Sequence, residues 1–234
     1  MGKKVAIMQP YFLPYMGYWQ LINDVDEFVV YDNIKYTKKG WINRNRFLQN
    51  GKDTLFSLAL QSGSDDLDVS DRQLSSAFER DRLVRQLKEA YRKAPFFSEN
   101  FSIIEQVINF PDNNLSAYIE NSIRTLCSYL SITTPVITSS DIKIDHKSLK
   151  GKDKVIEICK SLGATEYVNP IGGLDLYDRS EFEKAGLKLT FLRSRSLDYK
   201  QSGNEFIPHL SILDVLMFNS LEQTKEYLGS FTTE

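Results

Sequence analysis

The sequence contains few of the residues that build disulfide scaffolds or zinc sites, with 2 cysteines and 2 histidines among 234 residues. Two cysteines cannot form the framework of several bridges that small secreted domains use. No spacing of cysteine and histidine is typical of a zinc site. Cys127 and Cys159 both fall in helical patterns. We therefore predict two reduced core thiols and no metal site.

Long hydrophobic runs are also absent. No apolar stretch approaches the 18 or so residues that a transmembrane helix needs. The first residues are basic and then apolar, but Gln9, Pro10 and Pro14 interrupt them before a signal-peptide core is complete. These features predict a cytoplasmic protein with no membrane insertion.

Neither sign of charge dominates, because 29 Lys and Arg face 31 Asp and Glu, for a net charge of −2. This balance argues against an extended nucleic-acid-binding surface. Hydrophobic residues make up 41% and charged residues 26%, which is ordinary for a globular protein. The length fits a single domain over residues 1–234.

What is present is an alternation of strand-like and helical segments. Short apolar runs typical of buried parallel strands occur at residues 5–8, 27–31, 136–138, 166–168 and 187–192. Helical patterns between the second and third runs cover residues 72–93, 103–108 and 115–130. This order predicts an α/β fold, a Rossmann-like parallel sheet with a helical insertion at about residues 72–131.

Two further elements are predicted from local patterns. Residues 54–60 are typical of a strand, and Ser211 with Asp214 predicts a capping box that opens the last helix. The capping box has Asp where Glu is commoner.

Ligands of open parallel sheets bind outside the carboxyl ends of the strands. This rule indicates three loops, at residues 9–14, 32–46 and 169–175. The first holds Gln9 and Tyr11, followed by Tyr15 and Tyr18 at a helix start, where free N–H groups attract anions. The alternative interpretation is a rigid proline turn with tyrosines packed under the sheet.

The second loop begins a basic stretch, residues 33–52, with six Lys or Arg and no acid. Lys38, Arg44 and Arg46 supply positive charge that suits a phosphate or carboxylate. Asn43, with Asn45, adds two-sided hydrogen bonding, and Trp41 is suited to stack on a base or a sugar. A solvated charged face is the alternative.

The third loop, Pro170-Ile171-Gly172-Gly173, matches neither a P-loop nor a dinucleotide fingerprint. A tight turn explains it as well as a ligand does, and Asn169 at the strand end is the better candidate for touching one. Of the histidines, His209 is better placed than His146, because it lies just before Ser211 at the predicted helix start.

Several segments together resemble the WbqC-like protein family: IMQPYFLPYMGYWQLI, DEFVVYDNIKYTKKGWINRNR, AYRKAPFF, NPIGGLDLYDRSEFEKAGLKLTFL and FIPHLSILDVLMFNS. The resemblance covers nearly the whole chain. Such proteins are associated with O-antigen and related surface-polysaccharide (lipopolysaccharide) gene clusters. The resemblance implies transfer of glycine or another acyl group to an amino sugar.

The N-terminal segment is also similar to HIGH-motif nucleotidyltransferases and ligases of the pantothenate synthetase type. Tyr15 and Tyr18 stand where those enzymes have histidines, and Ser211 parallels their phosphate-binding serine. This likeness implies an ATP-using nucleotidyltransferase or ligase as an alternative. A sugar-nucleotide-binding protein without catalysis is a third hypothesis, because no nucleophile stands out.

The first hypothesis is therefore an N-acyl or aminoacyl transferase that acts on a nucleotide-linked amino sugar, with a small acyl or amino-acid donor. The co-substrate stays open between acyl-CoA and ATP. His209 and Asp32 are the candidate catalytic bases. The candidate substrate-binding residues are Gln9, Tyr11, Tyr18, Lys38, Trp41, Asn43, Arg44, Asn169, Gly172, Gly173 and Ser211.

Overall fold

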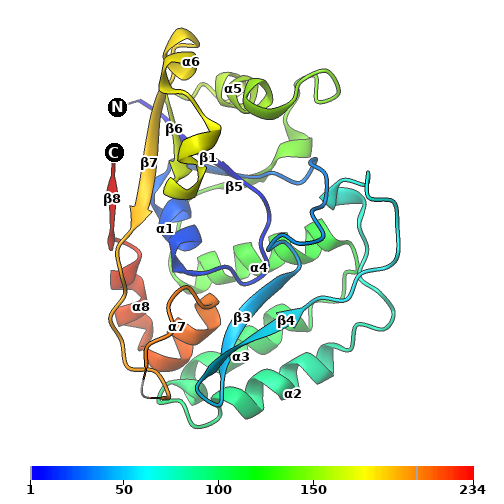
Figure 1. Ribbon diagram of the computed structural model, residues 1–234, viewed down its shortest axis with the longest axis vertical. Helices are drawn as coiled ribbons and strands as arrows, with labels where there is room; N and C mark the ends of the chain where they lie inside the picture. Colours follow the sequence, from blue (N-terminus) through cyan, green and yellow to red (C-terminus); the bar gives the residue numbers. More distant parts are fainter. Residues whose placement is uncertain (1, 204) are drawn as a thin grey trace.

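A six-stranded sheet organises the chain (Figure 1). The computed structural model describes residues 2–203 and 205–234. The strands lie in the order β5 (Val136–Thr138), β2 (Glu27–Val30), β1 (Lys4–Met8), β6 (Glu166–Pro170), β7 (Lys188–Ser194) and β8 (Phe231–Thr233). All neighbouring pairs are parallel except β7 and β8. The predicted Rossmann-like α/β fold is confirmed.

The order of the strands creates a switch point in the sheet. From β1 the chain builds outward through β2 to β5, and then returns to place β6 on the other side of β1. The connection after β1 therefore runs toward β2 and the connection after β6 runs toward β7, on the other side of the sheet. This divergence opens a crevice between the carboxyl ends of β1 and β6. This crevice is where a Rossmann-like sheet binds ligands.

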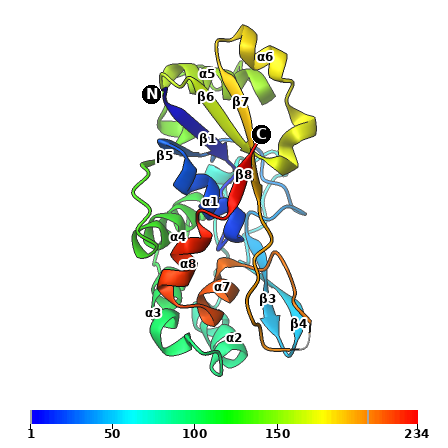
Figure 2. The ribbon, with the colours of Figure 1, turned by 90° about the vertical axis from the view of Figure 1, so that its left-hand side faces the viewer.

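Helices cover both faces of the sheet, because alternate residues of each strand point to opposite sides. Ala6 and Phe28 belong to one apolar cluster with side chains of α1 (Met16–Asp24) and α4 (Leu115–Tyr129). Val5 and Val29 belong to a second cluster with α5 (Gly151–Ser161) and α6 (Arg179–Lys184). Figure 2 shows α5 and α6 at the end of the molecule away from α2 and α3.

The segment between β2 and β5 holds a hairpin and three helices. β3 (Arg44–Gln49) pairs with β4 (Lys52–Ser57), and α2 (Arg80–Tyr91) and α3 (Phe97–Ile108) precede α4. The structure corrects two predictions here. The basic stretch forms a strand as well as a loop, because Phe47 and Leu48 are buried against the helices. The strand predicted at residues 54–60 is β4, shifted toward the hairpin turn.

The helix predicted from residue 72 begins at Arg80 instead. Residues 73 and 74 form isolated bridges to Asn114 and Leu60, and the Leu74 amide donates to the Asn113 carbonyl at 2.7 Å. These long-range bonds keep the backbone extended where periodicity alone favours a helix.

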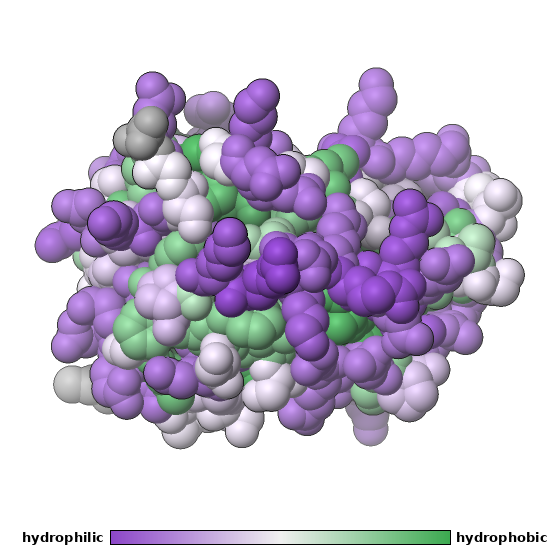
Figure 3. Space-filling view, turned by 90° about the horizontal axis from the view of Figure 1, so that it is seen from below, coloured by the Kyte–Doolittle hydropathy of each residue, from purple (hydrophilic) through white to green (hydrophobic). Residues whose placement is uncertain are grey.

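The face that carries α2 and α3 is largely hydrophilic, with hydrophobic side chains visible between the charged ones (Figure 3).

The C-terminal part packs α7 (Ile212–Phe218) and α8 (Leu221–Tyr227) beside the hairpin region before β8 rejoins the sheet. The Ser211 hydroxyl caps α7 by accepting from the Leu213 amide at 3.2 Å. The predicted capping box is only half formed, because Asp214 accepts instead from Tyr91, Tyr199 and Gln201.

Among the described residues, no helix has the length and apolar character needed to cross a membrane.

Candidate functional site

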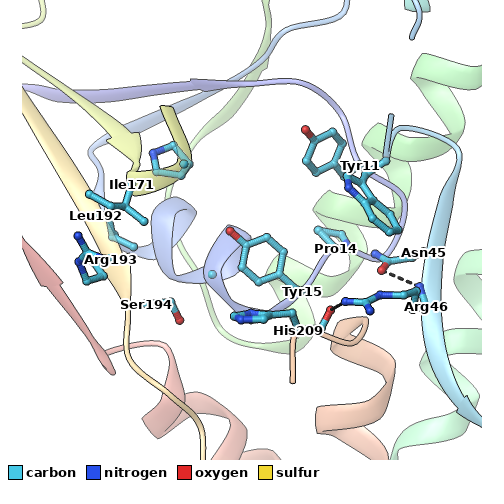
Figure 4. Close-up of a pocket in the computed structure, with 14 residues that line it drawn as sticks. Tyr11, Pro14, Tyr15, Asn45, Arg46, Ile171, Leu192, Arg193, Ser194 and His209 are labelled. Carbon is cyan, nitrogen blue, oxygen red and sulfur yellow. Dashed lines mark hydrogen bonds between the residues drawn. The ribbon is translucent and has the colours of Figure 1, made fainter. Parts of the chain in front are cut away.

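A cavity of about 500 Å³, here called the main cavity, opens at the carboxyl ends of β1, β6 and β7 (Figure 4). All three loops indicated by the sequence contribute to it. Its lining consists of Tyr11, Pro14, Tyr15, Gly17, Trp41, Asn45, Arg46, Pro170, Ile171, Gly172, Leu192, Arg193, Ser194 and His209. The cavity therefore lies at the switch point between β1 and β6.

Tyr15 stands in the middle of the main cavity at the start of α1. Its ring lies against the first turn, where a Cβ at Gly17 would come within 2.5 Å of the ring carbon Cε2. Only glycine leaves room for the ring in this position. Burial raises the pKa of Tyr15 above its usual 10, so its hydroxyl stays neutral and able to donate. Burial, and then the neighbouring Tyr15, also raise the pKa of Tyr11.

The β3 side of the main cavity is cationic and aromatic. The Arg46 guanidinium pairs with Asp53 at 2.9 Å and lies 5.7 Å from the centre of the Trp41 ring. Arg44 lies 5.6 Å from the same ring, so the indole is flanked by two guanidiniums. Trp41 is 42% exposed, which leaves it accessible to a ligand.

Asn45 fastens this side to the first loop. Its side-chain amide donates to the Leu13 carbonyl at 2.7 Å, and its oxygen accepts from the Arg46 amide at 2.8 Å. Leu13 has a positive φ of 46°. The amide thus holds a strained turn and the cationic strand in one arrangement.

The opposite wall comes from β7 and from the loop after β6. Arg193 faces the cavity from the end of β7 and pairs with Glu234 at 3.3 Å. A Cβ at Gly172 would meet no atom within 4 Å, so this glycine borders open space. A Cβ at Gly173 would lie 2.0 Å from the Asn169 amide nitrogen, so that glycine makes room for Asn169.

His209 lies between the two walls. Its ring packs edge-on against Tyr15 with centroids 6.0 Å apart, and its carbonyl accepts from Arg46 at 3.4 Å. Its φ of 58° is in the left-handed region that favours glycine. Its imidazole ring borders the main cavity. An imidazole ring can accept or donate a proton through its nitrogens.

Four of the residues proposed from the sequence line the main cavity: Tyr11, Trp41, Gly172 and His209. Tyr18 and Ser211 lie behind it, fully buried. The Tyr18 hydroxyl donates to the Gln9 carbonyl at 3.0 Å, and the Ser211 hydroxyl donates to the Leu13 carbonyl at 2.7 Å. Both hydroxyls therefore brace the first loop.

Three more of these residues support the basic loop. Asn43 donates to the Leu58 carbonyl at 2.8 Å and accepts from the Tyr36 hydroxyl at 2.7 Å. Arg44 donates to the carbonyls of Gly40 and Lys39, while Lys38 pairs with Asp65 at 2.5 Å. Lys38 and Arg44 do not line the main cavity, whereas Arg46 does.

Gln9 and Asn169 flank the cavity from the ends of β1 and β6 without lining it. The Gln9 side chain accepts from the Tyr11 hydroxyl at 3.4 Å. Asn169 accepts from the Tyr167 hydroxyl at 3.1 Å. Gln9 therefore contacts a residue of the lining, whereas Asn169 contacts a buried residue of the second apolar cluster.

Asp32 is 3% exposed and does not line the cavity. Its carboxylate accepts from the hydroxyls of Ser139 and Ser140, at 2.8 and 2.7 Å, and from the Ser140 amide at 3.0 Å. These bonds join the end of β2 to the turn after β5. Of the two candidate bases predicted from the sequence, His209 lines the main cavity and Asp32 does not.

The sequence reasoning missed Arg193 and Ser194 altogether, and noted Tyr15, Asn45 and Arg46 without including them in the site. A signal for Arg193 existed, because it directly follows the strand predicted at residues 187–192. The carboxyl-end rule applies to that strand as to its neighbours.

The charged groups of the cavity suit anions better than metal ions. Arg46 and Arg193 are guanidiniums, which bind phosphate or carboxylate through two parallel N–H bonds. In the described part of the chain, no three His, Cys, Asp or Glu side chains gather in a way that would hold a metal ion.

The chain is similar to known proteins along nearly its whole length. The family model described as the WbqC-like protein family matches residues 9–226. An uncharacterized protein of Mycobacterium tuberculosis, Rv1507c, is 30% identical over 230 residues, which are 97% of this chain and 97% of the relative. No solved structure matches at a significant level. The family match includes every residue that lines the main cavity.

Proposed function

The chain belongs to the WbqC-like protein family, and on that premise we propose that it is a transferase that acylates the amino group of a sugar carried on a nucleotide. The product would serve the synthesis of a surface polysaccharide such as O-antigen. The observation that carries the proposal is the pairing of two arginine walls with aromatic rings in one cavity at the switch point.

The size and charge of the main cavity match this substrate class. A volume of about 500 Å³ lies within the range of ligand pockets. A nucleotide-linked sugar carries a diphosphate between its base and its sugar, and guanidiniums bind phosphates bidentately. Arg46 and Arg193 already hold carboxylates at the rim, so a diphosphate would replace partly exposed partners.

The aromatic rings of Trp41 and Tyr15 would bind the uncharged parts of the substrate, the base and the sugar. Trp41 is accessible for stacking on a base or a sugar ring. Tyr15 keeps its proton because burial raises the pKa of its hydroxyl, so it acts as a donor to a sugar oxygen. These contacts orient the amino group toward His209.

His209 supplies the acid–base chemistry of the proposal. An amine that attacks an acyl carbon must lose a proton as the new bond forms. His209 borders the cavity, and its ring is placed to accept that proton. The donor is either a thioester or a carboxylate activated by ATP.

Arginine variants test the substrate class. We expect Arg46→Ala and Arg193→Ala each to weaken binding of UDP-glucosamine by about tenfold or more, because each removes a bidentate phosphate contact. Arg85→Ala, on the exposed face of α2, is the matched control and should bind as the wild type does. Calorimetry gives the affinities. Wild-type affinity in both cavity variants would refute the phosphate assignment.

Product analysis separates the alternatives. Incubation with UDP-glucosamine and acyl-CoA should yield an acylated sugar nucleotide by mass spectrometry, and His209→Ala should bind the sugar nucleotide without turnover. Stabilisation by ATP alone with release of pyrophosphate would favour a nucleotidyltransferase or ligase. Tight sugar-nucleotide binding without any product in the wild type would favour a binding protein.

A further inference from the structure

A second hollow, here called the small cavity, adjoins the main cavity on the far side of Tyr15 and His209. Its volume is about 240 Å³, and Tyr15, Ser194 and His209 line both cavities. Figure 4 shows these three side chains together between the Arg193 and Arg46 walls. A group bound in the small cavity therefore lies across His209 from a ligand in the main cavity.

The lining of the small cavity combines apolar and polar side chains in about equal measure. Aliphatic side chains come from Met16, Leu197, Leu210 and Val215, and aromatic rings from Tyr199 and Phe206. Its only permanently charged lining side chain in the described chain is Arg195, which is exposed. No carboxylate lines it among those residues. An ammonium group placed there would lose its hydration without gaining an opposite charge.

The aromatic wall is held in place from behind. The Tyr199 hydroxyl donates to the buried Asp214 carboxylate at 2.7 Å, so the ring rather than the hydroxyl faces the cavity. Phe206 packs edge-on against that ring with centroids 5.0 Å apart. Gln201 donates to Asp214 at 2.7 Å and accepts from the Ile207 amide at 2.8 Å. Tyr199 and Gln201 are thus both hydrogen-bonded to Asp214 of α7.

We propose that the small cavity binds the acyl group of the donor, and that this group is short and uncharged rather than an aminoacyl group. The proposal rests on the proposed function and settles the donor that it left open. The aliphatic and aromatic side chains of the lining can contact a short alkyl chain. The described residues of the lining offer no carboxylate to an ammonium group, and the volume of about 240 Å³ leaves no room for a whole coenzyme. Arg195, at the exposed rim, is placed to meet phosphates of a carrier thioester.

The reaction between the two cavities balances without another reactant. The amine nitrogen forms a bond to the acyl carbon, and the carbon–sulfur bond of the thioester breaks. His209 takes one proton from the nitrogen and gives it to the departing thiolate. The products are an amide on the sugar and a free thiol.

Two small probes test the charge preference without any turnover. Butanamide is uncharged and glycinamide carries an ammonium group at pH 7. We expect butanamide to shift the methyl NMR signals of Val215 and Leu210 at millimolar concentration, and glycinamide to leave them unchanged. The methyl signals of Val155, on the other face of the sheet, are the control. Equal shifts from both probes, or none from either, would overturn the proposal.

A filled cavity tests the role in transfer. Ser196 is exposed and lines the small cavity, whereas Ser202 is exposed on the same loop and does not. Ser196→Phe should raise the KM for butyryl-CoA by about tenfold or more, with UDP-glucosamine affinity within about twofold of the wild type. Ser202→Phe should leave both values unchanged. Wild-type kinetics in Ser196→Phe would refute the acyl site.

The two proposals fail in different ways. If the wild type binds no sugar nucleotide but butanamide still shifts Val215, the proposed function is wrong and the small cavity remains a site for uncharged alkyl groups. If UDP-glucosamine binds and is glycylated, the proposed function stands and the inference about the donor is wrong.

Discussion

At the scale of single residues, the geometry of the site depends on the lack of a side chain at Gly17. The Tyr15 ring occupies the space that any larger side chain would need, and it packs on His209 from there. If a larger side chain at residue 17 displaced the Tyr15 ring, the ring would also leave its place between the main cavity and the small cavity. Stability and binding should therefore respond differently to a change at this position.

Gly17→Ala tests this dependence. We expect sugar-nucleotide affinity to fall by about tenfold, because the methyl group displaces the Tyr15 ring. The free energy of unfolding should stay the same or rise by up to about 1 kcal/mol, because alanine favours helix α1. Calorimetry and denaturant unfolding give the two values. Gly172→Ala is the control, because Gly172 lines the same cavity and has space for a methyl group. This variant should keep the packing of Tyr15 on His209, which the NMR signals of His209 report. Unchanged affinity in Gly17→Ala would contradict this account of Tyr15.

At the scale of elements, one carboxylate joins two central strands at their starts. Glu166, at the beginning of β6, accepts from the Thr190 hydroxyl at 2.6 Å and from Lys188 at 3.2 Å, both on β7. Burial alone would raise the pKa of Glu166, but these two hydrogen bonds and the charges of Lys188 and Lys4 together outweigh it and hold the pKa below its usual 4.5. The charged form is therefore favoured by folding.

The sign of this shift predicts a pH dependence. A carboxylate with a depressed pKa stabilises the fold above pH 4.5, and that stability is lost as the pH falls through the lower pKa of the folded state. We expect Glu166→Gln to lower the free energy of unfolding by about 1 kcal/mol at neutral pH. The difference from the wild type should shrink toward about pH 3 in denaturant titrations. Glu157→Gln, on the exposed side of α5, should show no such trend, and a constant difference for Glu166→Gln would argue against the linkage.

At the scale of the whole molecule, the reactivity of the two thiols reports whether the helices on each face of the sheet stay packed. Cys127 lies in α4 and Cys159 in α5, on opposite faces of the sheet. Burial raises the pKa of each thiol to about 12, so neither is a reactive thiolate in the folded protein. We expect both to react with a disulfide reagent only at the rate of unfolding, measured by absorbance beside an unfolding trace. Fast reaction of one thiol would reveal a local opening of its face.

The parts of the molecule that follow from local pattern were predictable from sequence. Apolar runs such as Val5–Met8 predicted the parallel strands, and the carboxyl-end rule led to three loops that share one cavity. The hairpin strand Arg44–Gln49 was missed because its surface residues are polar and only long-range packing makes it a strand. The bond from Asn45 to Leu13 and the placing of Arg193 opposite Arg46 depend on tertiary structure, which no local pattern contains.

The lining of the main cavity is drawn from segments as far apart as Tyr11 and His209. A chain still emerging from the ribosome holds the first loop and the basic strand long before the segment with His209 exists, so it has no site to occupy. The completed site exists only in the folded molecule, and a ligand at one hundred times its Kd would then stabilise the entire fold by about 2.7 kcal/mol. A bound ligand would thus protect the protein against unfolding and degradation in the cell.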